Sequence, residues 1–201
     1  MPEYIIEILF EGLPQDDSLD EALGEAGVVA VEPADDDLLR LTASIAGLNA
    51  VQAAASLIAD VKYIAPHAWP IMAERDLVNT TDIADRAGVS REAVRNWVLG
   101  RRRQGRFPRA VGTPGGQKVW EWGSVCAWLE HNLDMGDGLL YPTHDQFGEI
   151  DVHIRQVRDG SYTWHRITAT RAEERPASFV GSERAPRASR LPRDWKKVRA
   201  S

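Results

Sequence analysis

The chain has 201 residues, which suits one large domain or two small ones. Its apolar fraction of 43% is normal for a packed core, and no apolar run reaches the roughly 18 residues of a membrane span. One cysteine, Cys126, excludes a disulfide framework, and the N-terminus lacks the features of a signal peptide. We therefore expect a soluble cytoplasmic protein without membrane contact.

The net charge of −6 is distributed unevenly along the chain. Residues 1–75 hold 14 acidic and 3 basic residues, a net charge of −11. Within residues 86–118, nine basic residues stand against the single acidic residue Glu92. An acidic first module therefore precedes a locally basic one, and this asymmetry is more informative than the net charge.

Residues 1–75 alternate between strand and helix patterns. A β-prone run at 4–10 precedes a short helix that Asp17 is predicted to cap. Two strands, 28–33 and 38–45, flank a turn with three consecutive aspartates. No further ligand is spaced to complete a calcium loop, so these aspartates predict a solvated turn. The inward positions of the short helix are apolar, namely Leu19, Leu23 and Ala26.

A second helix is predicted after Asn49, its N-cap, and a last strand at 67–74 contains Pro70, which restricts it to an edge or a bulge. The resulting order, β-α-β-β-α-β over 1–75, is the arrangement of ferredoxin-like domains. Many functions use this fold, so it identifies none of them. The expected fold class is α+β, with a ferredoxin-like domain over 1–75, a winged helix-turn-helix domain over 76–135 and a partly flexible basic C-terminal region.

Two short amphipathic runs within residues 81–99 meet at Gly88. A tight turn there needs the positive φ that glycine adopts, and the small side chain of Ala84 lets a second helix cross closely. Ser90 then caps the second helix. Apolar residues occupy the inward positions of both runs, namely Ile83, Ala87, Val89, Val94 and Trp97. This spacing predicts a helix-turn-helix.

The outward face of the second helix, over 90–99, carries polar and basic side chains: Ser90, Arg91, Glu92, Arg95 and Asn96. Arginine can bridge guanine O6 and N7, and asparagine can bridge adenine N6 and N7. Such a face suits the major groove of DNA. The alternative is a solvated helix with ordinary surface charges.

A basic segment and a hairpin pattern follow. Its arginines are Arg101, Arg102, Arg103, Arg106 and Arg109. Two short strands, 109–112 and 118–121, flank a Thr-Pro-Gly-Gly turn, which predicts a wing over 107–121. Trp120 and Trp122 are expected to anchor this wing to the core, although aromatic stacking on bases is the alternative. Ser124 is predicted to start a closing helix with Val125 and Leu129 inward.

Residues 78–131 resemble the MerR-like winged helix, a group that includes phage excisionases and AlpA-type regulators. The matching signs are the helix-turn-helix at 81–99, basic Lys118 followed by Trp120, and the helix from 124. The resemblance implies that Arg91, Arg95 and Asn96 enter the major groove and that Lys118 grips the flanking backbone. The chain lacks the long coiled-coil helix and C-terminal effector site of typical MerR-type activators, so effector sensing is not implied.

Residues 136–170 are predicted to form a C-terminal segment with one helix. Thr143 and Gln146 fit a capping box, and Phe147, Ile150, Ile154 and Val157 form a helical stripe that favours a helix over about 143–157. The alternation of Ile150, Val152 and Ile154 and the turn dipeptide at 159–160 leave a hairpin open.

Residues 171–201 are rich in Arg, Pro, Ser and Ala and predict a basic flexible tail. Three roles remain open for it: a solubilising end, a basic arm on DNA phosphates, and a cover for the acidic module.

Catalysis has little support in the sequence. The histidines are scattered, and no glycine-rich phosphate loop follows a strand, so we expect no enzyme activity, metal or cofactor. The predicted function is sequence-specific binding of double-stranded DNA by a small bacterial or phage transcriptional regulator. Alternatives are an excisionase-type architectural or recombination factor, and a protein-interaction adaptor. We expect a homodimer, paired through residues 1–75 or through the C-terminal region.

Overall fold

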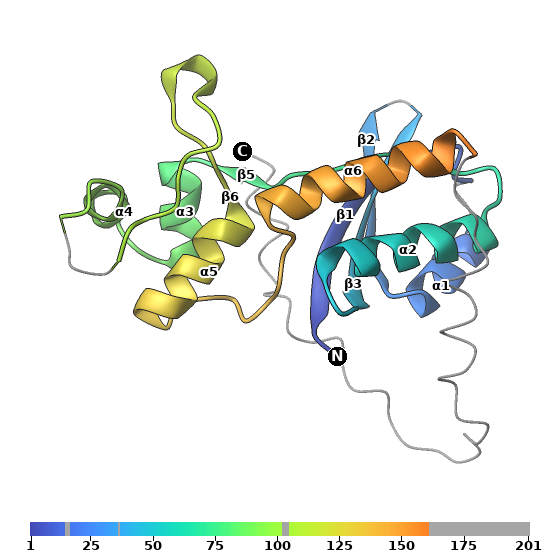
Figure 1. Ribbon diagram of the computed structural model, residues 1–201, viewed down its shortest axis with the longest axis horizontal. Helices are drawn as coiled ribbons and strands as arrows, with labels where there is room; N and C mark the ends of the chain where they lie inside the picture. The colour runs from blue at the N-terminus through green and yellow to red at the C-terminus, as the bar shows by residue number, and fades with distance from the viewer. Residues whose placement is uncertain (15–16, 36, 102–104, 161–201) are drawn as a thin grey trace, which may run out of the picture.

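The computed structural model describes residues 1–14, 17–35, 37–101 and 105–160, and the described chain is of the α+β class. Figure 1 shows a larger part, in which helices pack on a sheet, and beside it a smaller, mostly helical part. The larger part begins, in chain order, with β1 (Glu3–Glu11), α1 (Asp17–Glu25), β2 (Val28–Asp35), β3 (Leu38–Ala46), α2 (Ala50–Ile64) and β4 (Trp69–Ala73). None of the described helices is long and apolar enough to cross a membrane.

The four strands form an antiparallel sheet in the order β2-β3-β1-β4. Alternate β1 side chains, Ile6, Ile8 and Phe10, are buried in the core because successive residues of a strand point to opposite faces. β4 is an edge strand, and its pairing with β1 shifts register at Pro70, which faces Phe10. The prediction of an edge or a bulge at Pro70 is therefore confirmed.

The helices α1 and α2 bury their apolar faces in this core. Leu23 of α1 and Leu57 of α2 are fully buried. Asn49 caps α2, because its Oδ1 accepts a hydrogen bond from the Gln52 N–H over 2.8 Å. The cap predicted for α1 is wrong in position, since that helix already includes Asp17.

A helix late in the chain completes the same core. α6 (His144–Arg158) begins at the capping box of Thr143 and Gln146, which confirms the helix and excludes the hairpin. Its buried residues Phe147, Ile150, Ile154 and Val157 pack against the core of the first module. Asp151 also accepts a hydrogen bond from the Ala73 N–H over 3.2 Å, so α6 protects part of the edge of β4.

The smaller part has its own core. Its elements are β5 (Leu77–Val78), α3 (Thr80–Ala87), α4 (Arg91–Val98), a 3₁₀ turn (Pro114–Gly116), β6 (Trp120–Glu121) and α5 (Trp122–Leu133). The buried residues include Ile83, Val94, Trp97, Trp120 and Leu129. α5 starts at Trp122, two residues before the predicted start, so Ser124 lies inside the helix rather than at its N-terminus.

β5 and β6 form a two-stranded antiparallel sheet. The predicted strand at 118–121 contains β6, but the sequence patterns indicated neither β5 nor its pairing with β6. Leu77 pairs with Glu121, and Val78 pairs with Trp120. A two-residue strand is too short to show the alternation by which strands are recognised. This pairing places the base of the predicted wing beside the start of α3.

Candidate nucleic-acid interface

The turn between α3 and α4 has the conformation that the sequence predicts. Gly88 has φ +64° and ψ 33°, in the left-handed region. The Val89 N–H donates to the Ala84 carbonyl oxygen over 2.9 Å, which closes the end of α3. A Cβ atom at Gly88 would meet nothing within 4 Å, so the requirement for glycine comes from φ and not from space.

Both helices begin at side-chain caps. Ser90 Oγ accepts a hydrogen bond from the Ala93 N–H over 3.2 Å, which confirms Ser90 as the cap of α4. Asn79 caps α3 in a capping box with Asp82, a feature that the sequence analysis missed. The pattern Asn-x-x-Asp immediately before Ile83 could have signalled it.

The helix α4 separates an apolar face from a basic one. Val94 and Trp97 are buried in the second core. Arg91 and Arg95 are exposed and lie one turn apart, so both occupy the outward face. Asn96 is only half-buried, and its main-chain oxygen accepts a hydrogen bond from the Arg101 N–H over 3.0 Å.

A cluster of aromatic rings joins α4 to the hairpin and to α5. The centroids of Trp97 and Trp128 lie 5.6 Å apart, and Phe107 packs edge-on against Trp128 at 4.9 Å and Trp120 at 5.7 Å. Trp120 and Trp122 are 1% and 7% exposed, so the structure confirms their role in the core and leaves their rings unavailable for stacking on bases. No sequence pattern indicates Phe107, whose ring packs against both Trp120 and Trp128.

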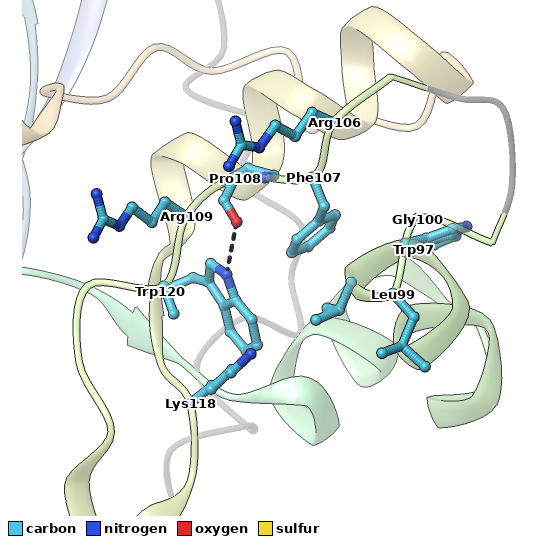
Figure 2. A pocket seen from close by; sticks show the side chains of 11 residues that line it. Trp97, Leu99, Gly100, Arg106, Phe107, Pro108, Arg109, Lys118 and Trp120 are labelled. Atoms are coloured by element: carbon cyan, nitrogen blue, oxygen red, sulfur yellow. Dashed lines mark hydrogen bonds between the residues drawn. The ribbon is translucent and has the colours of Figure 1, made fainter.

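A groove of about 640 Å³ lies between the C-terminal end of α4 and the base of the hairpin (Figure 2). The rings of Trp97, Phe107 and Trp120 line it, and Leu99 at the end of α4 is half exposed beside it. Three exposed cations also line the groove, namely Arg106, Arg109 and Lys118. The hairpin itself is narrow, with a single bridge between Gly112 and Val119.

The basic residues of this surface make no ion pair within the described part of the chain: Arg91, Arg95, Arg101, Arg106, Arg109 and Lys118. In contrast, Arg40, Arg75 and Arg86 each contact a carboxylate. Cations without a partner remain available for anions that approach from solvent, such as phosphates.

The predicted DNA-binding residues therefore fall into two sets. Ser90, Arg91, Arg95 and Asn96 belong to the start and outward face of α4, whereas Arg106, Arg109 and Lys118 gather at the hairpin end. Ser90 lies at the N-terminal end of α4 and the groove at its C-terminal end, and the eight residues of the helix span roughly 12 Å. Arg101 is exposed just beyond α4, and Arg102 and Arg103 lie outside the described residues.

The chemistry of the second core does not support nucleophilic catalysis by Cys126. Its thiol is 1% exposed, and burial raises its pKa to about 12, with a smaller contribution from its hydrogen bond to Asp137. The thiol therefore stays protonated and unreactive at neutral pH. Among the described residues, no group of His, Cys, Asp and Glu side chains is arranged to hold a metal ion.

Comparison of the chain with protein-family models, with curated proteins and with solved structures found no match in any of the three.

Proposed function

We propose that this protein binds double-stranded DNA in a sequence-specific manner through a MerR-like winged helix. In this proposal α4 enters the major groove, and the hairpin at 107–121 is the wing that lies along the backbone. The observation that carries it is a set of six exposed cations that have no carboxylate partner within the described part of the chain. Two of them lie on α4, Arg101 lies three residues beyond its end, and three lie at or beside the hairpin. The buried rings beneath hold these two elements in one surface.

The two parts of this surface would divide the work of recognition. Arg91, Arg95 and Asn96 are of the types that hydrogen-bond to base edges. Arg106, Arg109 and Lys118 lie beside the groove at the hairpin, where point charges suit phosphates. Ser90 would contribute less than expected from the sequence, because its hydroxyl already caps α4.

We propose further that the first module is a ferredoxin-like domain. The support is its strand order, β2-β3-β1-β4, together with the two crossover helices α1 and α2. α4 and the hairpin lie at the end of the molecule away from α1 and α2 (Figure 1). An acidic module in that position avoids repulsion between its carboxylates and DNA phosphates.

The most direct biological role for such a protein is that of a small transcriptional regulator in the cytoplasm of a bacterium. One α4 of eight residues contacts few base pairs, so we propose that two copies bind adjacent half-sites. Their pairing would use the first module or the C-terminal region.

The test is selection of bound fragments from a bacterial genomic library, followed by footprinting of the recovered sites. We expect enrichment of a discrete motif by the full chain and loss of that enrichment in the triple variant Arg91→Ala, Arg95→Ala, Asn96→Ala. A variant with the exposed α6 residues Arg155 and Arg158 changed to alanine is the control and should recover the same motif. Recovery of random fragments, or of none, would contradict sequence-specific binding.

The pattern of the footprints distinguishes the roles within this class. A single site or a pair of half-sites supports the regulator, whereas an array of adjacent sites on bent DNA supports an excisionase-type factor. Absence of DNA binding with retained folding would favour the adaptor.

A further inference from the structure

The first module is the larger part of the molecule, whose core α6 completes, and the second module is the smaller part, from β5 to α5. Three consecutive charged residues between β4 and β5 join them: Glu74, Arg75 and Asp76. Relative motion of two domains is the default when the chain between them is free. In this protein each of the three side chains has a fixed partner, and these partners belong to both modules.

Glu74 is held by the first module. Its carboxylate accepts hydrogen bonds from the guanidinium of Arg40 on β3, one of them from Nη2 to Oε1 over 2.7 Å. Its main-chain N–H donates to the carbonyl oxygen of Glu7 on β1 over 2.9 Å. The first residue of the joint therefore continues the sheet.

Asp76 is held by the second module. Its carboxylate accepts hydrogen bonds from both terminal nitrogens of Arg86 on α3, the one from Nη2 to Oδ1 over 3.0 Å. Its carbonyl oxygen accepts from the Trp122 N–H at the start of α5 over 2.8 Å. The Arg86 guanidinium also lies 4.9 Å from the centre of the Trp122 ring.

Arg75, between them, contacts both modules at once. Its Nη1 donates to Oε1 of Glu121, over 2.6 Å, and Glu121 on β6 is only 3% exposed. Its guanidinium lies 4.7 Å from the centre of the Phe147 ring on α6, a helix that packs in the first core. The same Glu121 oxygen lies 3.0 Å from Nδ1 of His144, at the start of α6.

The return connection between the modules, from α5 to α6, is also fixed. Asp137 accepts hydrogen bonds from Trp122 Nε1, Tyr141 Oη and Cys126 Sγ, over 3.1, 2.7 and 3.0 Å. Three residues later, the Leu140 carbonyl oxygen accepts from the Ile5 N–H of β1 over 2.8 Å. Both crossings between the modules are therefore tied to folded elements at each end.

From these contacts we infer that Glu74, Arg75 and Asp76 form a locked joint that makes the two modules one rigid body. Three ion pairs build the joint: Arg40–Glu74, Arg75–Glu121 and Arg86–Asp76. Of their six side chains, Glu121 is buried and the other five are partly exposed. Arginine–carboxylate pairs with two hydrogen bonds constrain orientation as well as distance. Arg75, Arg86, Asp76 and Glu121 are thus positioning residues, which set the angle of the first module to the surface formed by α4 and the hairpin.

The inference does not depend on DNA binding, and its test contains no DNA. Spin labels are attached to Glu21→Cys on α1 and Asp85→Cys on α3, two exposed positions in different modules. The native Cys126 is buried with its thiol protonated, so it does not compete for the label. The distribution of distances between the labels is then measured by pulsed electron paramagnetic resonance in the full chain.

We expect one narrow distribution in the parent and a distribution about twofold wider when Asp76→Asn and Glu121→Gln are combined, because domains without a fixed interface move by default. These two changes keep the volume of each side chain and remove its charge. The control combines Asp145→Asn and Glu149→Gln, exposed carboxylates of α6, and should leave the distribution narrow. A wide distribution in the parent would overturn the inference.

Folding is checked in the same samples by the cooperative thermal transition. A narrow distribution in a folded Asp76→Asn/Glu121→Gln protein would show that the pairs do not hold the modules. If that double variant does not fold, the single change Arg75→Gln is used, and the same narrow result in it would also overturn the inference.

Discussion

The indole N–H of Trp120 donates a hydrogen bond to the carbonyl oxygen of Pro108, with 3.0 Å between the two atoms. Pro108 lies at the start of the hairpin and Trp120 at its end, so this bond closes the base of the hairpin across twelve residues (Figure 2). Trp120 is also among the largest fully buried side chains of the protein. The base of the hairpin is therefore part of the core, whereas its tip is exposed.

Replacement of Trp120 by phenylalanine should lower the free energy of unfolding by about 2–4 kcal/mol, because it leaves the Pro108 carbonyl without its partner and a cavity in the core. Urea unfolding of the parent and the variant measures this difference. Val111→Ala, on the exposed part of the same hairpin, is the control and should change stability by less than about 0.5 kcal/mol. An equal loss in both variants would contradict the anchoring role of Trp120.

The contribution of α6 to the first core can be tested at Ile150, which is fully buried. Ile150→Ala should destabilise the protein by about 2–5 kcal/mol, the range for large-to-small changes in cores. Val152, on the exposed side of the same helix, provides the matched control Val152→Ala. Similar stabilities of the two variants would show that α6 does not complete the core in solution.

The recognition role proposed for α4 predicts a loss of specificity when its outward side chains are removed. Arg95→Ala and Asn96→Ala should each weaken binding to the preferred site by roughly 1–3 kcal/mol and leave binding to random DNA almost unchanged. Fluorescence anisotropy with both DNA molecules measures the two affinities. Equal losses on both would place these side chains on the backbone rather than on bases.

The phosphate contacts proposed for the hairpin cations predict a change in the salt dependence of DNA binding. Arg109 and Lys118 are changed together to glutamine. The magnitude of the negative slope of log affinity against log salt concentration should then fall by about 1–2, since each phosphate contact contributes about 0.9. Titrations at several salt concentrations measure the slope. The control combines Arg155→Gln and Arg158→Gln on α6, which change the net charge by the same amount and should leave the slope unaltered. A smaller slope in both double variants would indicate an effect of net charge.

His153 predicts a dependence of stability on pH. The residue is 8% exposed, and burial lowers the pKa of its imidazole below the ordinary value of 6.5. Below about pH 6.5 the unfolded chain therefore binds a proton that the folded chain does not, and the free energy of unfolding falls as the pH falls. His153→Gln removes this uptake and should flatten the decline between pH 7 and 5.

Unfolding curves across that pH range provide the measurement. His131→Gln, at an exposed position, is the control and should follow the parent. A parallel decline in the parent and in His153→Gln would assign the acid sensitivity to other groups.

Much of the local structure could be predicted because its causes lie within a few residues of each other. The caps Asn49, Ser90 and Thr143 each bond to a main-chain N–H three residues on, and Gly88 turns the chain through its own φ. Periodicity likewise identified the buried side of α6. The outward basic residues of α4 followed once its inward side was known.

The sequence by itself thus determined the starts of α2, α4 and α6, the turn between α3 and α4 and the buried faces of these helices, since these depend on near neighbours and on the period of the chain. Only the tertiary structure decided that α6 covers the core of the chain's first residues, that β5 pairs with β6, and that Arg75 meets Glu121. Ala73 and Asp151, for instance, are 78 residues apart, and Arg75 and Glu121 are 46 apart. Contacts of this kind depend on how separate elements pack together, and the local sequence around one residue does not predict a partner that is distant along the chain.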